Sequence, residues 1–395
     1  MPQSTFAPTS EAELESVVRG AIAAKTPLEV TGRNSKATLG RPVQAAATLS
    51  LSGFSRITSY EPEELVLTAG AGTPRSEVEP LLAARGQCFA FEPPDYSRLL
   101  GVGDAGSLGG MIGCNLAGPR RIKAGAARDH FLGFTGVSGR GEIYQAGGKV
   151  VKNVTGYDLP KLLAGSYGTL TALTSVTIKV LPAPESEDTL ILEGLDDATA
   201  IRAMSLALQS PFEVSGAAHL PATINAGIAE TLLRLEGVPP SVAYRRDRLA
   251  ALLAEFGICR SHPADESRAR WIAVRDVHPF AGDQSRIIWR LSVPPMEGAR
   301  ITAAIADRAD AQWFYDWGGG LIWLSLPSSD DGGAQLVRGA ANSGHATLIR
   351  APQDVRAAVP VFTPQPTALE ELSRRVKAGF DPAGILNPGR MYQGW

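Results

Sequence analysis

Hydrophobic and polar positions follow two different periods along the chain. In "SEAELESVVRGAIAAK", residues 10–25, apolar residues recur three and four positions apart, which predicts an amphipathic helix. Ser10 and Glu13 have the spacing of a capping box at the start of this helix. Short runs rich in β-branched residues follow between glycines and prolines, and we expect strands at 27–32, 47–52, 56–61 and 65–73.

The pattern then changes order rather than repeating a regular strand–helix unit. A helix is expected at 75–86, where Gly86 ends it, and a long β-rich run covers 169–182. After a polar, acidic stretch, strand patterns alternate with helical ones as far as about residue 350, which predicts a second, smaller sheet covered by helices. A proline-rich joint precedes a helix at 367–380. This mixed order is typical of an α+β protein.

Composition narrows the possible classes of function. The chain has 395 residues, 44% of them apolar, and a net charge of -2, so it lacks the basic excess of a nucleic-acid binder. The first 25 residues do not read as a secretory signal, and no apolar run reaches the roughly 18 residues of a membrane span. We therefore expect a soluble, cytoplasmic protein without a direct membrane anchor.

Three cysteines, Cys88, Cys114 and Cys259, lie far apart and form no CxxC pair. We expect them to be reduced, buried thiols, and the chain lacks the ligands for an iron–sulfur cluster of its own.

The segment "KVVKNVTGYDLPKLLAGSYGTLTAL" has two incompatible interpretations. Asn153 begins an N-glycosylation pattern, which would place this segment on the surface of a secreted protein. The small-residue turn at 165–169 instead suits the wall of a binding site. In a cytoplasmic protein the glycosylation pattern is a chance match, and Gly156, Tyr157 and Asp158 then form a turn and helix start that direct the following residues towards a ligand.

Common nucleotide and hydrolase motifs are missing from the sequence. It contains no GxxxxGK[ST], no GxSxG and no HExxH. "GVGDAG" has the spacing GxGxxG, but it does not lie between a leading strand and a helix that are followed by an acidic residue on a second strand, as a Rossmann site requires. What remains is a set of small-residue loops at 31–36, 106–110 and 165–169. Each loop alone is more often only a turn, but consecutive backbone N–H groups without large side chains can hold a pyrophosphate. Together the loops indicate a large, phosphate-bearing cofactor.

Three stretches carry a family resemblance: "GSLGGMIGCNLAGPRR…GAARD", "GGKVVKNVTGYDLPKLLAGSYGTLTALTSVTIKV" and "FDPAGILNPGRMY". They resemble the FAD-binding domain of the vanillyl-alcohol oxidase (PCMH) type and, more narrowly, the E-type FAD-binding subunit of bacterial glycolate oxidase. The resemblance is dense over 101–182 and 375–392. It implies an α+β fold with a PCMH-type FAD-binding domain of two α/β subdomains at 1–183, a smaller α/β cap domain for substrate or partner at 184–362, and a C-terminal segment, 363–395, that returns to the FAD domain.

The resemblance also implies which residues contact FAD. The loop at 31–36 would face the pyrophosphate of FAD, with the 106–110 loop on its other side, and the residues from Asn115 to Asp129 would continue along the flavin. The residues from Gly165 to Leu173 would face the ribityl and adenine end of FAD, and Asn387 and Arg390 would approach the isoalloxazine. The full set is Thr31, Gly32, Arg33, Asn34, Ser35, Lys36, Gly106, Ser107, Leu108, Gly109, Gly110, Asn115, Gly118, Arg128, Asp129, Gly165, Ser166, Gly168, Thr169, Leu173, Asn387 and Arg390.

Two details of this site follow from the residue types. A cation such as Arg390 near the flavin favours the anionic reduced ring. The first loop departs from the family's commoner Gly-Gly-Gly run, and it has no His or Cys at the usual tethering position, so we expect non-covalent FAD.

Oxidation of a 2-hydroxy acid requires a general base. Related flavin dehydrogenases place two metal-binding histidines and a Glu-His pair in the second domain, and the corresponding positions here hold Asp316, Trp323, Gly344 and His345. A Trp ring and a Gly offer no metal ligand, so we predict no catalytic metal. His345 is the candidate base; an ordinary hydrogen-bonded histidine is the competing interpretation.

The implied function is that of one component of a glycolate oxidase complex, with a second flavin subunit and an iron–sulfur subunit as partners. The complex would oxidise glycolate, and also D-lactate, to the 2-oxo acid, at the inner membrane through its partners. This chain either relays electrons or is itself catalytic, with Arg350 or Arg286 holding the substrate carboxylate. A free-standing flavin alcohol oxidase is a third hypothesis. The turn with Arg120, Arg121 and Lys123 either attracts an anion or a partner, or is simply solvated, and His130 beside Asp129 orders the neighbouring loop.

Overall fold

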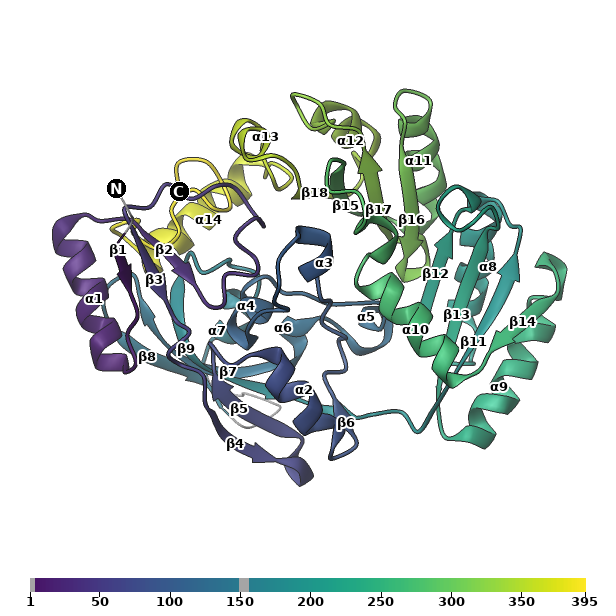
Figure 1. Ribbon diagram of the computed structural model, residues 1–395, viewed down its shortest axis with the longest axis horizontal. Helices are drawn as coiled ribbons and strands as arrows, with labels where there is room; N and C mark the ends of the chain where they lie inside the picture. The colour runs from purple at the N-terminus through teal and green to yellow at the C-terminus, as the bar shows by residue number, and fades with distance from the viewer. Residues whose placement is uncertain (1–3, 149–155) are drawn as a thin grey trace.

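The chain has two parts, which lie side by side in the ribbon of Figure 1. The first part contains a three-stranded and a five-stranded sheet, and the second part contains an eight-stranded sheet. The computed structural model describes residues 4–148 and 156–395. The glycosylation pattern at Asn153 therefore lies outside the described residues. Along the described chain, no helix has both the length and the apolar character to cross a membrane.

The first subdomain contains the small parallel sheet, in the order β1(Ser4–Phe6), β3(Ala47–Ser50), β2(Leu28–Thr31). Helix α1(Glu11–Ala24) buries Leu14 and Val18 in the same hydrophobic cluster as Leu49 of β3. As predicted, Ser10 caps this helix, with its hydroxyl accepting from the Glu13 N–H. The Glu13 carboxylate accepts from the Thr9 N–H rather than from Ser10, so the cap is shifted by one residue on that side.

The second subdomain is an antiparallel five-stranded sheet beneath short helices. Its order is β4(Ile57–Glu61), β5(Val66–Gly70), β9(Thr171–Lys179), β7(Phe131–Ser138), β8(Ile143–Gly147). The strands predicted at 56–61, 65–73 and 169–182 are confirmed by β4, β5 and β9. Its other elements are α2(Arg75–Ala83), β6(Gln87–Cys88), α3(Ser97–Leu100), α4(Leu108–Gly113), α5(Arg121–Ala124), α6(Ala127–His130), α7(Leu159–Leu163) and β10(Leu181–Pro182).

The eight-stranded sheet belongs to the other part of the molecule, and its neighbouring strands are antiparallel. Its order is β14(Cys259–His262), β11(Ser186–Glu193), β13(Glu230–Gly237), β12(Gly216–Leu220), β16(Gln312–Asp316), β17(Leu321–Leu326), β15(Ile287–Ser292), β18(His345–Arg350). The prediction of a second, smaller sheet is wrong, because short strands that the sequence pattern left unassigned, such as β12 and β14, extend it. A sheet of antiparallel neighbours can grow in this way without long crossovers.

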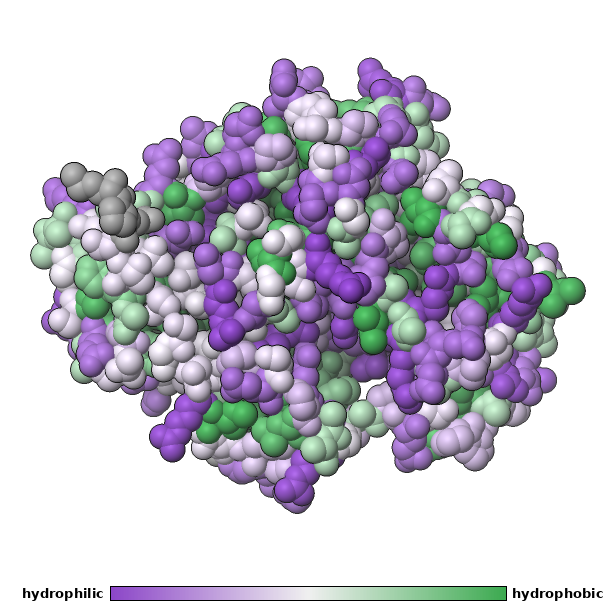
Figure 2. Space-filling model, viewed as in Figure 1, coloured by the Kyte–Doolittle hydropathy of each residue, from purple (hydrophilic) through white to green (hydrophobic). Residues whose placement is uncertain are grey.

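The two faces of this sheet differ in what covers them. One face packs with apolar residues of α8(Asp197–Gln209), α9(Pro239–Leu252), α11(Gly298–Ala306) and α12(Ala334–Ala340). The other face contributes Phe314 and Trp323 to a cluster that also holds Trp271 of α10(Ala264–Arg275) and Tyr96 and Leu99 of the first part. This second face is thus the interface between the two parts of the chain. In Figure 2, strongly hydrophilic residues gather near the centre of the visible face, where the parts meet.

The chain then returns to its first part through α13(Gln353–Ala358) and α14(Thr367–Phe380). The bounds of α14 are those expected from the sequence. Lys377 on α14 donates to the carbonyls of Thr169 (2.7 Å) and Leu386 (3.0 Å), and the Leu28 N–H donates to Ile385 O (2.8 Å). These bonds fix the C-terminal segment against β2 and against the end of the 165–169 loop.

Candidate functional site

One pocket lies where the three small-residue loops meet. Residues from the loops at 31–36, 107–110 and 166–168 line it together, and its empty volume, open mouth included, is about 830 Å³. Strand β2 ends at the first loop, and Ser107 caps the helix α4 that begins in the second. The pocket is therefore built from segments distant in sequence, as the three loops together predicted.

The first loop presents unused backbone donors to this pocket. Asn34 adopts a left-handed conformation (φ 58°), which Asn tolerates better than most residues. Within the described part of the chain, the N–H groups of residues 33–36 form no hydrogen bond. In the second loop, by contrast, the N–H groups of Leu108 and Gly109 donate to carbonyls of Thr73 and Ala71. The free donors are thus concentrated at 33–36, and a row of such groups suits an anionic ligand such as a pyrophosphate.

Lys36 connects the first and second loops. Its ammonium donates to the Ser35 hydroxyl (3.1 Å) and to the carbonyl of Ala105 (3.0 Å), and burial lowers its pKa. A Cβ on Gly106 (φ 97°) would lie 2.4 Å from both Lys36 Nζ and Ser35 Oγ. Gly106 therefore allows the two loops to approach each other.

Asn387 and Arg390 reach this site from the C-terminal segment, in different ways. The Asn387 side chain accepts from the Val30 N–H (2.8 Å) and donates to the Tyr167 carbonyl (2.8 Å), so it joins two walls of the pocket instead of lining it. Arg390 lines the pocket and donates to the Lys36 carbonyl (2.6 Å). Its Nε is buried and has no hydrogen-bond partner among the residues that the structure describes. This free donor beside the pocket also suits an anionic ligand.

The predicted contact residues fall into two groups. Those that line the pocket are Thr31, Gly32, Arg33, Asn34, Ser35, Lys36, Ser107, Gly109, Gly110, Ser166, Gly168, Leu173 and Arg390. Those that do not are Gly106, Leu108, Asn115, Gly118, Arg128, Asp129, Gly165, Thr169 and Asn387; of these, Gly165 and Thr169 line a neighbouring pocket under α14.

Several residues away from this lining have structural contacts instead. The Asn115 side chain accepts from the Arg128 N–H, and Asp129 accepts from the Ala126 N–H. The Gly118 carbonyl accepts from the indole of Trp317, across the interface between the two parts. These contacts hold the turns beside the pocket in place. That Asn115, Gly118 and Asp129 themselves contact a cofactor stays a prediction.

Other lining residues were not predicted: Val30, Ala37, Leu51, Ala71, Gly113, Cys114, Leu163, Tyr167 and Thr171. Cys114 and Tyr167 lie within the glycine-rich stretches, so their sequence position offered a signal. Leu51 and Ala71 follow strands whose local pattern says nothing of a ligand. The cysteines are free, as expected, but half-buried rather than fully buried, and burial raises the pKa of each thiol.

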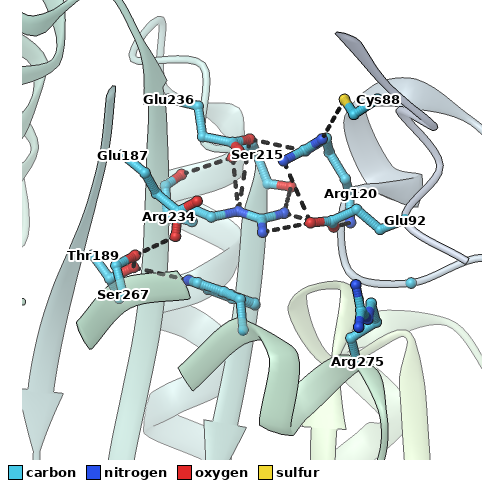
Figure 3. A network of polar contacts seen from close by, with 12 residues as sticks. Cys88, Glu92, Arg120, Glu187, Thr189, Ser215, Arg234, Glu236, Ser267 and Arg275 are labelled. Atoms are coloured by element: carbon cyan, nitrogen blue, oxygen red, sulfur yellow. Dashed lines mark hydrogen bonds and ion pairs between the residues drawn. The ribbon is translucent and has the colours of Figure 1, made fainter. Parts of the chain in front are cut away.

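A charged network connects the two parts of the chain (Figure 3). Arg234 on β13 donates to both carboxylate oxygens of Glu92 (2.8 Å each), and Arg120 pairs with Glu236. The interpretation of Arg120 as a solvated or partner-attracting cation is wrong, because its charge is neutralised inside the protein by acids from both parts. Burial alone would raise the pKa of Glu92, but Arg234 and Arg120 lower it to about 2.

The candidate catalytic base, His345, lies on the eight-stranded sheet. His345 is exposed at the start of β18, opposite Ser292 of β15, and does not line the pocket. His130 is buried and hydrogen-bonded to the Ala124 carbonyl, and burial lowers its pKa. In residues 4–148 and 156–395, no group of three or more His, Cys, Asp or Glu side chains has an arrangement able to hold a metal ion.

Arg350 and Arg286, the expected carboxylate-binding arginines, are already engaged. Arg350 donates to the backbone carbonyls of Leu99 and Asp283, and Arg286 to Ser325 and Asp310. These bonds join strands and loops of the fold, so the contacts do not favour either arginine as a substrate ligand.

Comparison with known proteins agrees with this geometry. Residues 2–147 match the family described as FAD binding domain. The chain is 36% identical over 386 residues to glycolate oxidase subunit GlcE of Escherichia coli (strain K12), covering 97% of each protein. It is 29% identical over 249 residues to glycolate oxidase subunit GlcD of Bacillus subtilis (strain 168), covering 61% of this chain and 50% of that one.

In fold, the chain is similar to 4-ethylphenol oxidase from Gulosibacter chungangensis, with a TM-score of 0.72 at 15% identity over 98% of this chain and 89% of that one. The prediction of an α+β fold with a PCMH-type FAD-binding domain is confirmed. FAD is the cofactor of this chain.

Proposed function

The chain belongs to the GlcE family of glycolate oxidase subunits, and from that premise we propose that it is the FAD-binding subunit of a complex that oxidises glycolate to its 2-oxo acid. D-lactate is the second substrate that we propose. The row of free N–H groups at 33–36, in a pocket completed by Arg390, is the observation that carries the proposal. The partners in this proposal are a second flavin subunit and an iron–sulfur subunit, which hold the complex at the cytoplasmic side of the inner membrane.

The residues of the pocket have separate tasks in this proposal. The backbone of residues 33–36 holds the pyrophosphate of FAD, and Arg390 presents its free Nε to a negatively charged part of the cofactor. Bound FAD would supply an acceptor for a hydride, and the iron–sulfur partner would supply a route for the electrons. Binding is non-covalent in this proposal, because the loop at 31–36 contains no His or Cys that could form a covalent bond with the flavin. Acid precipitation of the purified protein should therefore release all of its FAD.

Two roles are compatible with this chain's place in the complex. In the first, its flavin relays electrons from the second flavin subunit; Trp323 and Gly344 at positions where related enzymes bind metal support this role. In the second, the chain itself binds and oxidises the hydroxy acid. Arg121 and Arg290, which are half-buried and form no ion pair with any described residue, favour this second role.

An anaerobic experiment tests the function and separates the two roles. The reconstituted complex, mixed with glycolate, should lose its flavin absorbance at about 450 nm within seconds, which is ordinary for enzyme turnover. The proposal fails if the complex keeps that absorbance and reduces no acceptor. The isolated chain loaded with FAD is the second arm: bleaching by glycolate shows direct oxidation and excludes a pure relay.

His345 is tested in the same complex. Replacement by Ala leaves turnover unchanged if the histidine is only an exposed residue of β18, and abolishes most of it if the imidazole is the base. Gln209, exposed on α8, offers a control position for an equally simple Ala substitution.

A further inference from the structure

Two cationic side chains meet at an aromatic ring in the interface between the two parts of the chain. The guanidinium carbons of Arg121 and Arg290 lie 4.8 and 4.9 Å from the ring centroid of Trp317. Arg121 comes from α5 of the FAD-binding part and Arg290 from β15 of the large sheet. Both side chains are half-buried.

Neither guanidinium has an acidic partner. Over residues 4–148 and 156–395, the side chains of Arg121 and Arg290 form no hydrogen bond and no ion pair. Burial, followed by the charge of Arg290, lowers the pKa of Arg121, so the two cations repel each other; the charge of Asp129, which forms no ion pair with Arg121 in the described structure, acts in the opposite direction with a smaller effect. Half-buried cations are normally paired, and an anion bound beside them would reduce this repulsion.

The acid closest along the chain to Trp317 does not supply that anion. Asp316 accepts a hydrogen bond from the Trp317 N–H, and burial raises its pKa to about 7. It forms no ion pair with Arg290 in the described structure. The other nearby arginines, Arg120 and Arg234, are in contrast bound to Glu92 and Glu236.

The two arginines lie next to the FAD pocket. Trp323, directly opposite Arg290 in the sheet, packs edge-on against Tyr96 with ring centroids 5.7 Å apart. Cys114 and Tyr167 line the FAD pocket and also pack against the interface cluster that contains Trp317 and Trp323. Burial raises the pKa of the Tyr167 phenol and the charge of Arg290 acts against this larger effect, so Arg290 lies near the end of the pocket formed by Cys114 and Tyr167.

Neutral hydrogen-bond donors surround the same place. The phenol groups of Tyr96 and Tyr167 form no hydrogen bond with any described residue, and burial raises the pKa of both, so they stay protonated. His345 lies on this face of the sheet as well, since Ser292, its partner in β18–β15 pairing, is two residues from Arg290. The place thus combines two free cations, two phenols and an imidazole on the nearby strand.

We propose that Arg290 and Arg121 bind the carboxylate of a small 2-hydroxy acid at the Tyr167 end of the FAD pocket, with Arg290 as the main ligand. A guanidinium offers two parallel donors to a carboxylate, and the flat Trp317 ring supports the arginines in the required orientation. The inference rests on the proposed oxidation of a 2-hydroxy acid and assigns the binding of that acid to this chain.

Calorimetric titration of the FAD-loaded chain with oxalate, an unreactive small dicarboxylate, tests the site. Wild type should bind oxalate, and Arg290→Met should weaken binding at least about tenfold, as for loss of a charge-assisted bidentate contact. Arg290→Lys should be intermediate, and Arg121→Met should weaken binding less. Arg308→Met, which removes an exposed arginine of the same part, should bind as wild type does.

FAD content, measured by absorbance, shows that each variant is folded, and Arg290→Lys carries the test if Arg290→Met does not retain FAD. An oxalate affinity of Arg290→Met equal to that of wild type would overturn the site. If Arg290→Met does not retain FAD, an equal oxalate affinity of Arg290→Lys would overturn it. So would an FAD-loaded wild type that does not bind oxalate, or one that binds inorganic phosphate equally well. The proposed function is judged separately, by glycolate-dependent acceptor reduction in the complex.

Discussion

Glu92 joins the two parts of the chain through charge. Its carboxylate accepts from both terminal nitrogens of Arg234 and from the Arg120 N–H at 2.7 Å. Removing one member of a buried ion network leaves the remaining charges uncompensated, and this costs more than the network itself contributes. The network's effect is therefore best measured by neutralising the acid while keeping its shape.

Glu92→Gln should lower the free energy of unfolding by about 3 kcal/mol at pH 7. The pKa of Glu92 is lowered from 4.5 to about 2 in the folded protein, so its stabilisation is complete above pH 4.5 and is lost as the pH falls towards 2. The difference between wild type and variant should therefore narrow below pH 4.5 in urea unfolding. Glu77→Gln, at an exposed acid of α2, is the control; an equal loss there would contradict the prediction.

Asp316 should behave in the opposite sense. Burial raises its pKa from 3.8 to about 7, so wild type loses stability as the pH rises from about 4 to 7. Asp316→Asn keeps an acceptor for the Trp317 N–H and has no charge to bury. It should match wild type at pH 4 and exceed its free energy of unfolding by more than about 1 kcal/mol at pH 8.

Thermal and urea unfolding at both pH values measure this effect. Asp330→Asn, in an exposed loop, should leave the pH dependence of wild type unchanged. A pH dependence retained in Asp316→Asn would mean that another group causes it.

Among the elements, the loop that enters α4 decides how closely the loops at 31–36 and 106–110 approach each other. Gly106 is buried with a positive φ, and the ammonium of Lys36 and the hydroxyl of Ser35 occupy the space where a Cβ would lie. A non-glycine residue there has both the conformational cost of a left-handed backbone and a steric conflict. The conflict would shift the very residues that line the pocket.

Gly106→Ala should weaken FAD binding at least about tenfold, because roughly 1–2 kcal/mol of backbone strain adds to the displacement of Ser35 and Lys36. Gly103→Ala is a matched control in the same loop, since its Cβ would meet nothing within 4 Å. Quenching of flavin fluorescence during titration of the FAD-free protein measures both. Equal affinities for the two variants would show that the loop contact does not shape the site.

For the whole molecule, FAD binding should couple to folding. The pocket is built from the first subdomain, the second subdomain and the C-terminal segment, so a ligand there binds only when all three are assembled. At a free FAD concentration about 100 times the dissociation constant, the free energy of unfolding should rise by about 2.7 kcal/mol. Thermal unfolding with and without FAD measures the gain.

At the same FAD concentration, the free energy of unfolding of Gly106→Ala should rise by less than that of wild type, because this variant binds FAD more weakly. A wild type whose unfolding is insensitive to FAD would contradict a site that depends on the assembled chain.

The local pattern of residues determined much of this protein. Periodicity predicted α1 and α14, β-branched runs predicted β4, β5 and β9, and small-residue loops predicted a phosphate-bearing cofactor, because helix period, strand alternation and turn chemistry act over a few neighbouring residues. The resemblance in the glycine-rich stretches then led to FAD.

Only the tertiary structure decided which residues meet. It joins Asn387 to Val30 and Tyr167 and neutralises Arg120 with Glu92 and Glu236. It also engages Arg350 with backbone carbonyls, whereas Arg290 forms no ion pair with any described residue. The sequence alone does not distinguish these arginines, since the residues next to each one along the chain do not show which acid or carbonyl it meets in the fold. Their roles depend on charges and carbonyls brought close by packing of distant segments, and the energy of a charge depends on those partners and on its burial.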